Sequence, residues 1–169
     1  MLDQMDFEPV FFAPFVSSAM AVEQDWTDYN GHLNVAYYGL MFDRAFDEAL
    51  SLLGLGPKVV RARGTSFFTV ETHTRFVREL PPGAPVRVTL RLVDYDEKRL
   101  HLFETLHHGA EGWIAATSEQ IALHVDLATR RARPIADDVL DRIAAMRATH
   151  AALPAPTEMG RRVGMAGRC

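Results

Sequence analysis

The chain has 169 residues, of which 48% are hydrophobic and 24% are charged, and its formal net charge is −4. This length predicts one domain with a sizeable core, and the composition is typical of a soluble globular protein rather than a disordered or fibrous one. The acidic balance argues against a general nucleic-acid binder, which normally has a basic excess.

The sequence shows no segment that would direct the chain into or across a membrane. The first ten residues, MLDQMDFEPV, include acidic but no basic residues, unlike a secretory or transit signal. No apolar run approaches the roughly 20 residues that span a bilayer. The single cysteine, Cys169, leaves no basis for disulfides or thiolate metal sites. We therefore expect a cytoplasmic protein with no membrane or nucleic-acid partner and no bound metal.

The N-terminal third predicts a strand followed by a long helix. Residues 15–24, FVSSAMAVEQ, suit a first strand. Between residues 35 and 53, apolar side chains recur at three- and four-residue steps, which indicates a helix with one broad apolar face. Asn34 is a natural N-cap, and Gly54 ends the helix. Gly39 lies inside the helix, where glycine costs about 1 kcal/mol relative to alanine, so we expect close backbone packing there.

From residue 66 onward the apolar period changes to two, which predicts strands. Four consecutive strands are expected at 66–77, 85–93, 100–108 and 113–127, with Val86, Val88, Leu90 and Leu92 of the second facing inward. A second amphipathic helix is expected at 137–150. This order predicts an α+β fold in which a long central helix is wrapped by a curved antiparallel sheet. The domain would span residues 1–153, and residues 154–169 would form a C-terminal tail.

A polar stretch, DYNGHLN, stands directly before the long helix and places Asp28, Asn30, His32 and Asn34 at alternate positions around Gly31. These residue types suit hydrolysis of an activated acyl group. Asp28 could act as base or nucleophile, His32 could orient it or polarise the substrate, and the asparagine amides could hold a water molecule. Backbone N–H groups from Gly31 into the first helical turn could hold an oxyanion at the positive end of the helix dipole. The alternative is a polar turn that only caps the helix.

At these residues the chain resembles the hotdog-fold acyl-CoA thioesterases of the 4-hydroxybenzoyl-CoA thioesterase-like superfamily. The Asp-x-x-Gly element of that superfamily corresponds to Asp28 and Gly31. The pattern Asp-x-Asn-x-His-x-Asn also looks like the catalytic element of plant acyl-ACP thioesterases. Over residues 15–150, roughly, the chain is similar to the betainyl-CoA thioesterases of bacterial carnitine breakdown.

This resemblance implies a hotdog fold and hydrolysis of a short-chain acyl-CoA to the free acid and coenzyme A. It implies no cofactor, because coenzyme A is part of the substrate. The sheet face that the helix does not cover still carries Phe, Val and Thr side chains, so we expect a homodimer, or a tetramer built from two dimers.

Two other functions remain open. Hotdog-fold enoyl-CoA hydratases and dehydratases resemble Asp-x-Asn-x-x-His, in which histidine follows aspartate by five positions. Here His32 follows Asp28 by four, which favours hydrolysis without excluding a divergent lyase. The third possibility is a non-catalytic acyl-CoA binding module. The sequence contains no G-x-S-x-G elbow, P-loop or dinucleotide glycine pattern.

Several residues outside the polar stretch are further candidates. Glu71 or Thr74 would hold the water or the thioester from across a dimer interface, although an interface polar ladder explains them equally well. Asp43 is a reserve candidate for the base, because some hotdog relatives use a helix carboxylate; a solvated helix face is the alternative. The basic residues that could contact the phosphates of coenzyme A are Arg61, Arg63, Arg130 and Arg131. The aromatic residues that could line the acyl pocket, or simply form core, are Trp26, Tyr29, Tyr37, Tyr38, Phe67 and Phe68.

Overall fold

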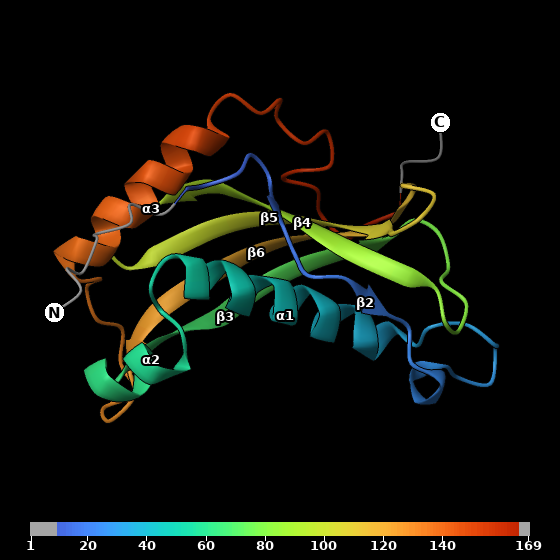
Figure 1. Ribbon diagram of the computed structural model, residues 1–169, viewed down its shortest axis with the longest axis horizontal. Coiled ribbons are helices and arrows are strands. Elements are labelled where there is room, and N and C mark those ends of the chain that lie inside the picture. The colour runs from blue at the N-terminus through green and yellow to red at the C-terminus, as the bar shows by residue number, and fades with distance from the viewer. Residues whose placement is uncertain (1–9, 166–169) are drawn as a thin grey trace, which may run out of the picture.

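The computed structural model describes residues 10–165, so Cys169 and the acidic residues before position 10 lie outside the described part of the chain. A long helix, α1 (Val35–Leu52), lies along one face of a curved antiparallel sheet (Figure 1). The long strands are β3 (Thr65–Phe76), β4 (Pro85–Tyr95), β5 (Arg99–His108) and β6 (Ile114–Asp126). This arrangement confirms the predicted α+β hotdog architecture and the four predicted strands.

The strands follow the order β1-β4-β5-β6-β3, which leaves β3 at one edge of the sheet. β1 (Phe15–Val16) and β2 (Met20–Ala21) both pair with β4 at the other edge. The prediction of one continuous strand at 15–24 is therefore wrong. Ser17 interrupts it, because its Oγ accepts the hydrogen bond of the Val88 N–H at 3.0 Å in place of a backbone carbonyl.

Helix α1 begins where the capping argument predicts. Asn34 has extended backbone geometry, and its Oδ1 accepts a hydrogen bond from the Ala36 N–H at 3.0 Å. The apolar face of α1 is buried against the sheet, while its opposite side is exposed. A Cβ placed on Gly39, on that exposed side, would meet no atom within 4 Å. The prediction of close backbone packing at Gly39 is thus wrong within one chain, and the glycine leaves open space beside the helix.

The face of the sheet that packs against α1 is called the inner face. On β4 it carries the four predicted inward residues, Val86, Val88, Leu90 and Leu92, each no more than 1% exposed. Helix α3 (Asp137–His150) has the predicted bounds and shares one hydrophobic cluster with the C-terminal half of α1. Two short helices were not anticipated, η1 (Gln24–Trp26) and α2 (Pro57–Arg63). Pro57 stands at the start of α2, where its missing N–H is harmless.

The segment from residue 154 to 165 runs back over the outer face of the sheet. Glu158 forms an ion pair with Arg75 of β3, and the Gly160 N–H donates to Glu119 Oε2 at 2.6 Å. These contacts fix the segment against strands β3 and β6. Within residues 10–165, none of the helices combines the length and the apolar character needed to cross a membrane.

Candidate active site

The DYNGHLN stretch forms a tight loop between η1 and α1. An isolated bridge joins Thr27 to Leu33 at its base, and the Asp28 N–H donates to the His32 carbonyl at 3.2 Å. Gly31 has a φ of 81°, a left-handed conformation that glycine adopts without a steric penalty. The loop therefore folds back on itself and brings Asp28 and His32 to the same side.

The Asp28 carboxylate is held by two donors from its own loop. Its Oδ1 accepts from the Asn30 N–H at 2.8 Å, and its Oδ2 lies 3.4 Å from Asn34 Nδ2. Because Asn34 also caps α1 through Ala36, one side chain connects the helix start to the carboxylate. The Asp28 carboxylate thus contacts the backbone N–H of Asn30 and the side-chain amide of Asn34.

His32 is half-buried, and its Nδ1 lies 3.2 Å from the Leu33 carbonyl oxygen. A carbonyl only accepts, so this contact places the proton of a neutral ring on Nδ1 and leaves Nε2 as an acceptor. An acceptor nitrogen in this position can receive a proton during a reaction. No group of three or more His, Cys, Asp or Glu side chains in the described range could hold a metal ion.

A cavity of about 330 Å³ opens beside this loop, a size suited to a small ligand. Its lining includes Asp28, His32, Val35, Tyr38, Phe76 and Arg78. Tyr38 and Phe76 meet edge to face at a centroid distance of 4.9 Å and form an aromatic wall. Phe76 and Arg78 were not among the predicted site residues, because the alternating pattern of β3 ends there and does not indicate which side chains turn toward the helix.

The N-terminal end of α1 faces the cavity, since its first residue, Val35, belongs to the lining. The positive end of the helix dipole is therefore directed at any group bound there. The Gly31 N–H, predicted to hold an oxyanion, donates to the Asp28 carbonyl at 3.0 Å. Its oxyanion role stays a prediction, and it requires a substrate oxygen to replace or share that bond.

Glu71 and Thr74 lie on opposite faces of β3. Thr74 belongs to the inner face, where its neighbour Thr72 contacts Ser118 at 3.1 Å. Glu71 lies on the outer face, in a hollow shared with His101 and the C-terminal segment. Of the two, Thr74 is therefore on the side of α1 and the cavity.

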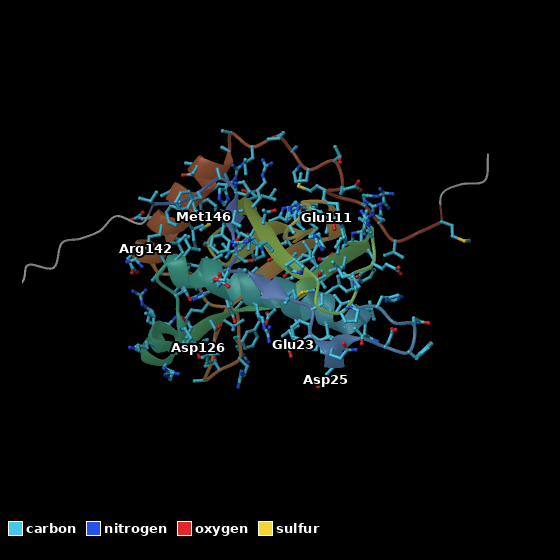
Figure 2. All side chains as sticks on the ribbon, turned by 45° about the vertical axis from the view of Figure 1, so that its right-hand side comes forward. Glu23, Asp25, Glu111, Asp126, Arg142 and Met146 are labelled. Carbon is cyan, nitrogen blue, oxygen red and sulfur yellow. The ribbon has the colours of Figure 1, made fainter. Side chains whose placement is uncertain are left out.

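The four arginines predicted to bind phosphates lie far from Asp28 within one chain. Arg61 and Arg63 are on α2, and Arg130 and Arg131 follow β6, all beyond the C-terminal end of α1. Figures 1 and 2 show this end, labelled by Asp126 in Figure 2, away from η1 and its labelled Asp25. The intervening helix has 18 residues and is about 27 Å long.

Arg63 is in addition paired with Asp138 at 2.6 Å. Within one chain, the four arginines therefore lie at the opposite end of α1 from Asp28. Arg78, by contrast, lines the cavity and lies 4.0 Å from the centroid of the Trp113 ring.

The predicted aromatic residues do not form one group. Tyr38 lines the cavity, while Trp26 and Tyr37 stack at 5.4 Å beside it. Phe67 packs on His124 near the far end of α1, away from the cavity. Tyr29, 98% exposed, and Phe68, 39% exposed, face solvent in the isolated chain.

A long helix wrapped by a curved antiparallel sheet, with a carboxylate-bearing loop directly before the helix, is the architecture of a hotdog-fold thioester hydrolase. A sequence model of the thioesterase-like superfamily matches residues 22–143. The chain belongs to this superfamily and is a thioester hydrolase.

Among the relatives, a betainyl-CoA thioesterase from Pseudomonas aeruginosa is 41% identical over 141 residues, which cover 83% of this chain and 89% of that protein. An L-carnitine dehydrogenase/betainyl-CoA thioesterase from Rhizobium meliloti is 38% identical over 143 residues, 85% of this chain but 29% of the fused protein.

Among solved structures, a hypothetical protein from Staphylococcus aureus in complex with CoA has a TM-score of 0.83 at 29% identity, covering 90% of this chain and 96% of that chain. A putative thioesterase from Pseudomonas putida has a TM-score of 0.80 at 32% identity, covering 92% of this chain and 99% of that chain.

Proposed function

We propose that the chain hydrolyses a short-chain acyl-CoA, betainyl-CoA, to the free acid and coenzyme A. The observation that carries this proposal is the 41% identity to a betainyl-CoA thioesterase over 89% of that protein's length. The cavity of about 330 Å³ beside Asp28 supports it, because its size suits a small acyl group.

In the proposed reaction Asp28 accepts a proton from a water molecule as the water oxygen attacks the thioester carbonyl, or the carboxylate attacks that carbonyl directly. The carbon–sulfur bond then breaks, and the thiolate of coenzyme A leaves and is protonated. If the carboxylate attacks directly, water then hydrolyses the resulting mixed anhydride, which releases the free acid and restores the Asp28 carboxylate. Asn30 and Asn34 hold the carboxylate, and Nε2 of His32 accepts or returns the proton. The dipole of α1 stabilises negative charge on the carbonyl oxygen. No separate cofactor enters these steps.

We further propose that the active form is a homodimer joined through β3, with a tetramer as the higher assembly. β3 is an edge strand of 12 residues, and an open edge of this length is a template for pairing. It also exposes large apolar side chains, including Val70 at 57% and Phe76 at 52%. Pairing would cover these side chains and bring Thr74 of one subunit close to the cavity beside Asp28 of another.

The test is thiol release from betainyl-CoA by the wild-type protein and by an Asp28→Asn variant. We expect the variant to lose at least about 100-fold in kcat, the range typical of a lost acid–base group. Asp25→Asn, an exposed carboxylate of η1, is the matched control and should keep the wild-type rate.

A folded Asp28→Asn variant with the wild-type rate would remove Asp28 from the mechanism. Loss of enoyl absorbance without thiol release, measured with an enoyl-CoA, would favour a hydratase instead. Tight acyl-CoA binding without turnover would favour a binding module.

A further inference from the structure

A glutamate occupies a core position at the centre of the sheet. Glu104 lies on β5 at the same alternation as Leu100, Leu102 and Leu106, and its exposed fraction is 0%. Glu104 thus interrupts a run of leucines on the inner face of β5. A carboxyl group at such a position loses its hydration, and a protein retains it only where other interactions offset that cost or where it serves a function.

The surroundings of Glu104 offset only part of this cost. Its Oε2 accepts a hydrogen bond from Gln120 Nε2, whereas Oε1 is buried and has no hydrogen-bond partner among residues 10–165. None of the ion pairs in that range includes Glu104, Asp43 or Asp47. Burial, and then the nearby Asp43 carboxylate, raise the pKa of Glu104 well above its ordinary value. These carboxyl groups therefore lack a cation.

The open side of α1 carries two exposed carboxylates, Asp43 and Asp47. Val35, Gly39, Asp43 and Asp47 follow one another at four-residue steps along that side, and Gly39 leaves its space unfilled. Val35 lines the cavity beside Asp28, and Asp47 lines a second cavity of about 700 Å³ near the C-terminal end of the helix. We call the exposed strip between these two cavities the α1 groove.

A chain of polar side chains joins Glu104 to the edge strand β3 beside this groove. Gln120 Nε2, which bonds Glu104, also lies 3.2 Å from Ser118 Oγ. Ser118 Oγ in turn lies 3.1 Å from the hydroxyl of Thr72, an exposed residue of β3. The inner face thus changes from apolar to polar between the buried carboxyl and the open edge.

We propose that Asp43 and Glu104 form the subsite for a positively charged acyl head group, so that the enzyme selects a quaternary ammonium acyl-CoA over its uncharged isostere. A quaternary ammonium has no N–H to donate, so only charge and aromatic faces can recognise it. Tyr38 and Phe76 supply the aromatic wall, and Asp43 supplies negative charge. A cation bound nearby would favour the ionised form of Glu104, which burial otherwise disfavours. This inference rests on the proposed thioesterase function and adds its selectivity.

The experiment compares two substrates of nearly equal shape. Betainyl-CoA carries a trimethylammonium group, and 3,3-dimethylbutanoyl-CoA replaces the charged nitrogen with carbon. The readout is the ratio of kcat/KM for the charged ester to that for the neutral ester, measured by thiol release. We expect a ratio well above one for the wild-type protein and a fall of at least about tenfold in Glu104→Gln, a near-isosteric change. Glu97→Gln, an exposed glutamate in the β4–β5 turn, is the matched control and should keep the wild-type ratio.

Asp43→Asn provides a second variant on the exposed side of α1, in case Glu104→Gln does not fold. A lower ratio in either folded variant supports the subsite, and a wild-type ratio in every folded variant overturns it. Equal hydrolysis of both esters by the wild-type protein also overturns the subsite but leaves the thioesterase function standing. Hydrolysis of neither ester rejects the proposed function itself.

Discussion

The side-chain amide of Asn34 contacts two different residues: its Nδ2 lies 3.4 Å from Asp28 Oδ2, and its Oδ1 accepts a hydrogen bond from the Ala36 N–H at 3.0 Å. The first contact orients the proposed catalytic carboxylate, and the second begins α1. The same side chain therefore contributes to helix stability and to the geometry of the site. Substitutions that keep one atom and change the other can separate the two contributions.

Replacing Asn34 by aspartate keeps an oxygen for the helix cap but removes the donor to Asp28. We expect the free energy of unfolding to change little and kcat to fall at least about tenfold, because two carboxylates would then repel each other. Asn34→Ala removes both contacts and should also lower the free energy of unfolding by about 0.5–2 kcal/mol. Urea unfolding and thiol release measure the two effects, and an Asn34→Asp variant with normal kcat would contradict the orienting role.

Replacing His32 by glutamine keeps hydrogen-bonding capacity at the loop but removes the ring nitrogen that can accept and return a proton. We expect kcat to fall by about 100-fold or more, within the range of general acid–base catalysis, with the fold intact. His107→Gln, a half-buried histidine of β5 away from the cavity lining, is the control. Equal rates for wild type and His32→Gln would assign His32 a structural role only.

Introducing a lysine on the exposed edge strand should prevent pairing through β3. Val70 is 57% exposed and lies at the irregularity between Thr69 and Glu71, so Val70→Lys should not disturb the core. We expect the sedimenting species to change from dimer to monomer, with loss of thiol release if the partner completes the site. Val163→Lys, at 91% exposure in the C-terminal segment, is the matched control. A dimer that persists in Val70→Lys would place the interface elsewhere.

The buried carboxyl of Glu104 should make stability depend on pH in a defined direction. Its pKa is raised in the folded state, so its contribution is fully present below the unfolded pKa of about 4.3 and is lost as the pH rises toward the folded pKa. Glu104→Gln removes this dependence, so the free energy of unfolding of the variant relative to wild type should increase between pH 4.5 and pH 7.5. Urea unfolding at several pH values measures the difference, with Glu97→Gln as control. A difference that is constant with pH would show that Glu104 titrates normally.

The regular elements could be predicted from the sequence because their apolar periods are uninterrupted. The three- and four-residue steps of α1 and the alternation in β4 correspond directly to buried faces. The Val88 N–H donates to the Ser17 side chain in place of a backbone carbonyl. Apolar periodicity does not reveal such a replacement, so the sequence wrongly predicts a continuous strand at 15–24. The structural meaning of Pro57 is ambiguous in the sequence, because a proline that follows one helix can also begin the next helix, as Pro57 begins α2.

Only the part of the candidate site that lies within one short segment of the sequence could be predicted. Asn30, His32 and Asn34 each contact Asp28 within a single loop, so their spacing carried the information. The distance between the loop and the arginines of α2 and β6 depends on the length and direction of α1, which residue type does not reveal. Phe76 and Arg78 enter the cavity through tertiary packing alone.

Glu104 is an intermediate case. Its position is visible in the sequence as a charge at an apolar alternation of β5, but only the folded chain shows that Oε1 has no hydrogen-bond partner among residues 10–165.

The buried carboxyl of Glu104, which has no ion-pair partner among residues 10–165, also bears on how such an enzyme would respond to selection. A variant library screened only for heat resistance should repeatedly replace Glu104 with an uncharged residue, since that change removes an uncompensated carboxyl from the core. The survivors would then accept neutral acyl groups more readily than the parent does. In this fold, the same substitution would broaden the substrate range and raise the thermal stability of the protein. Only continued selection for activity on the charged substrate would retain the glutamate.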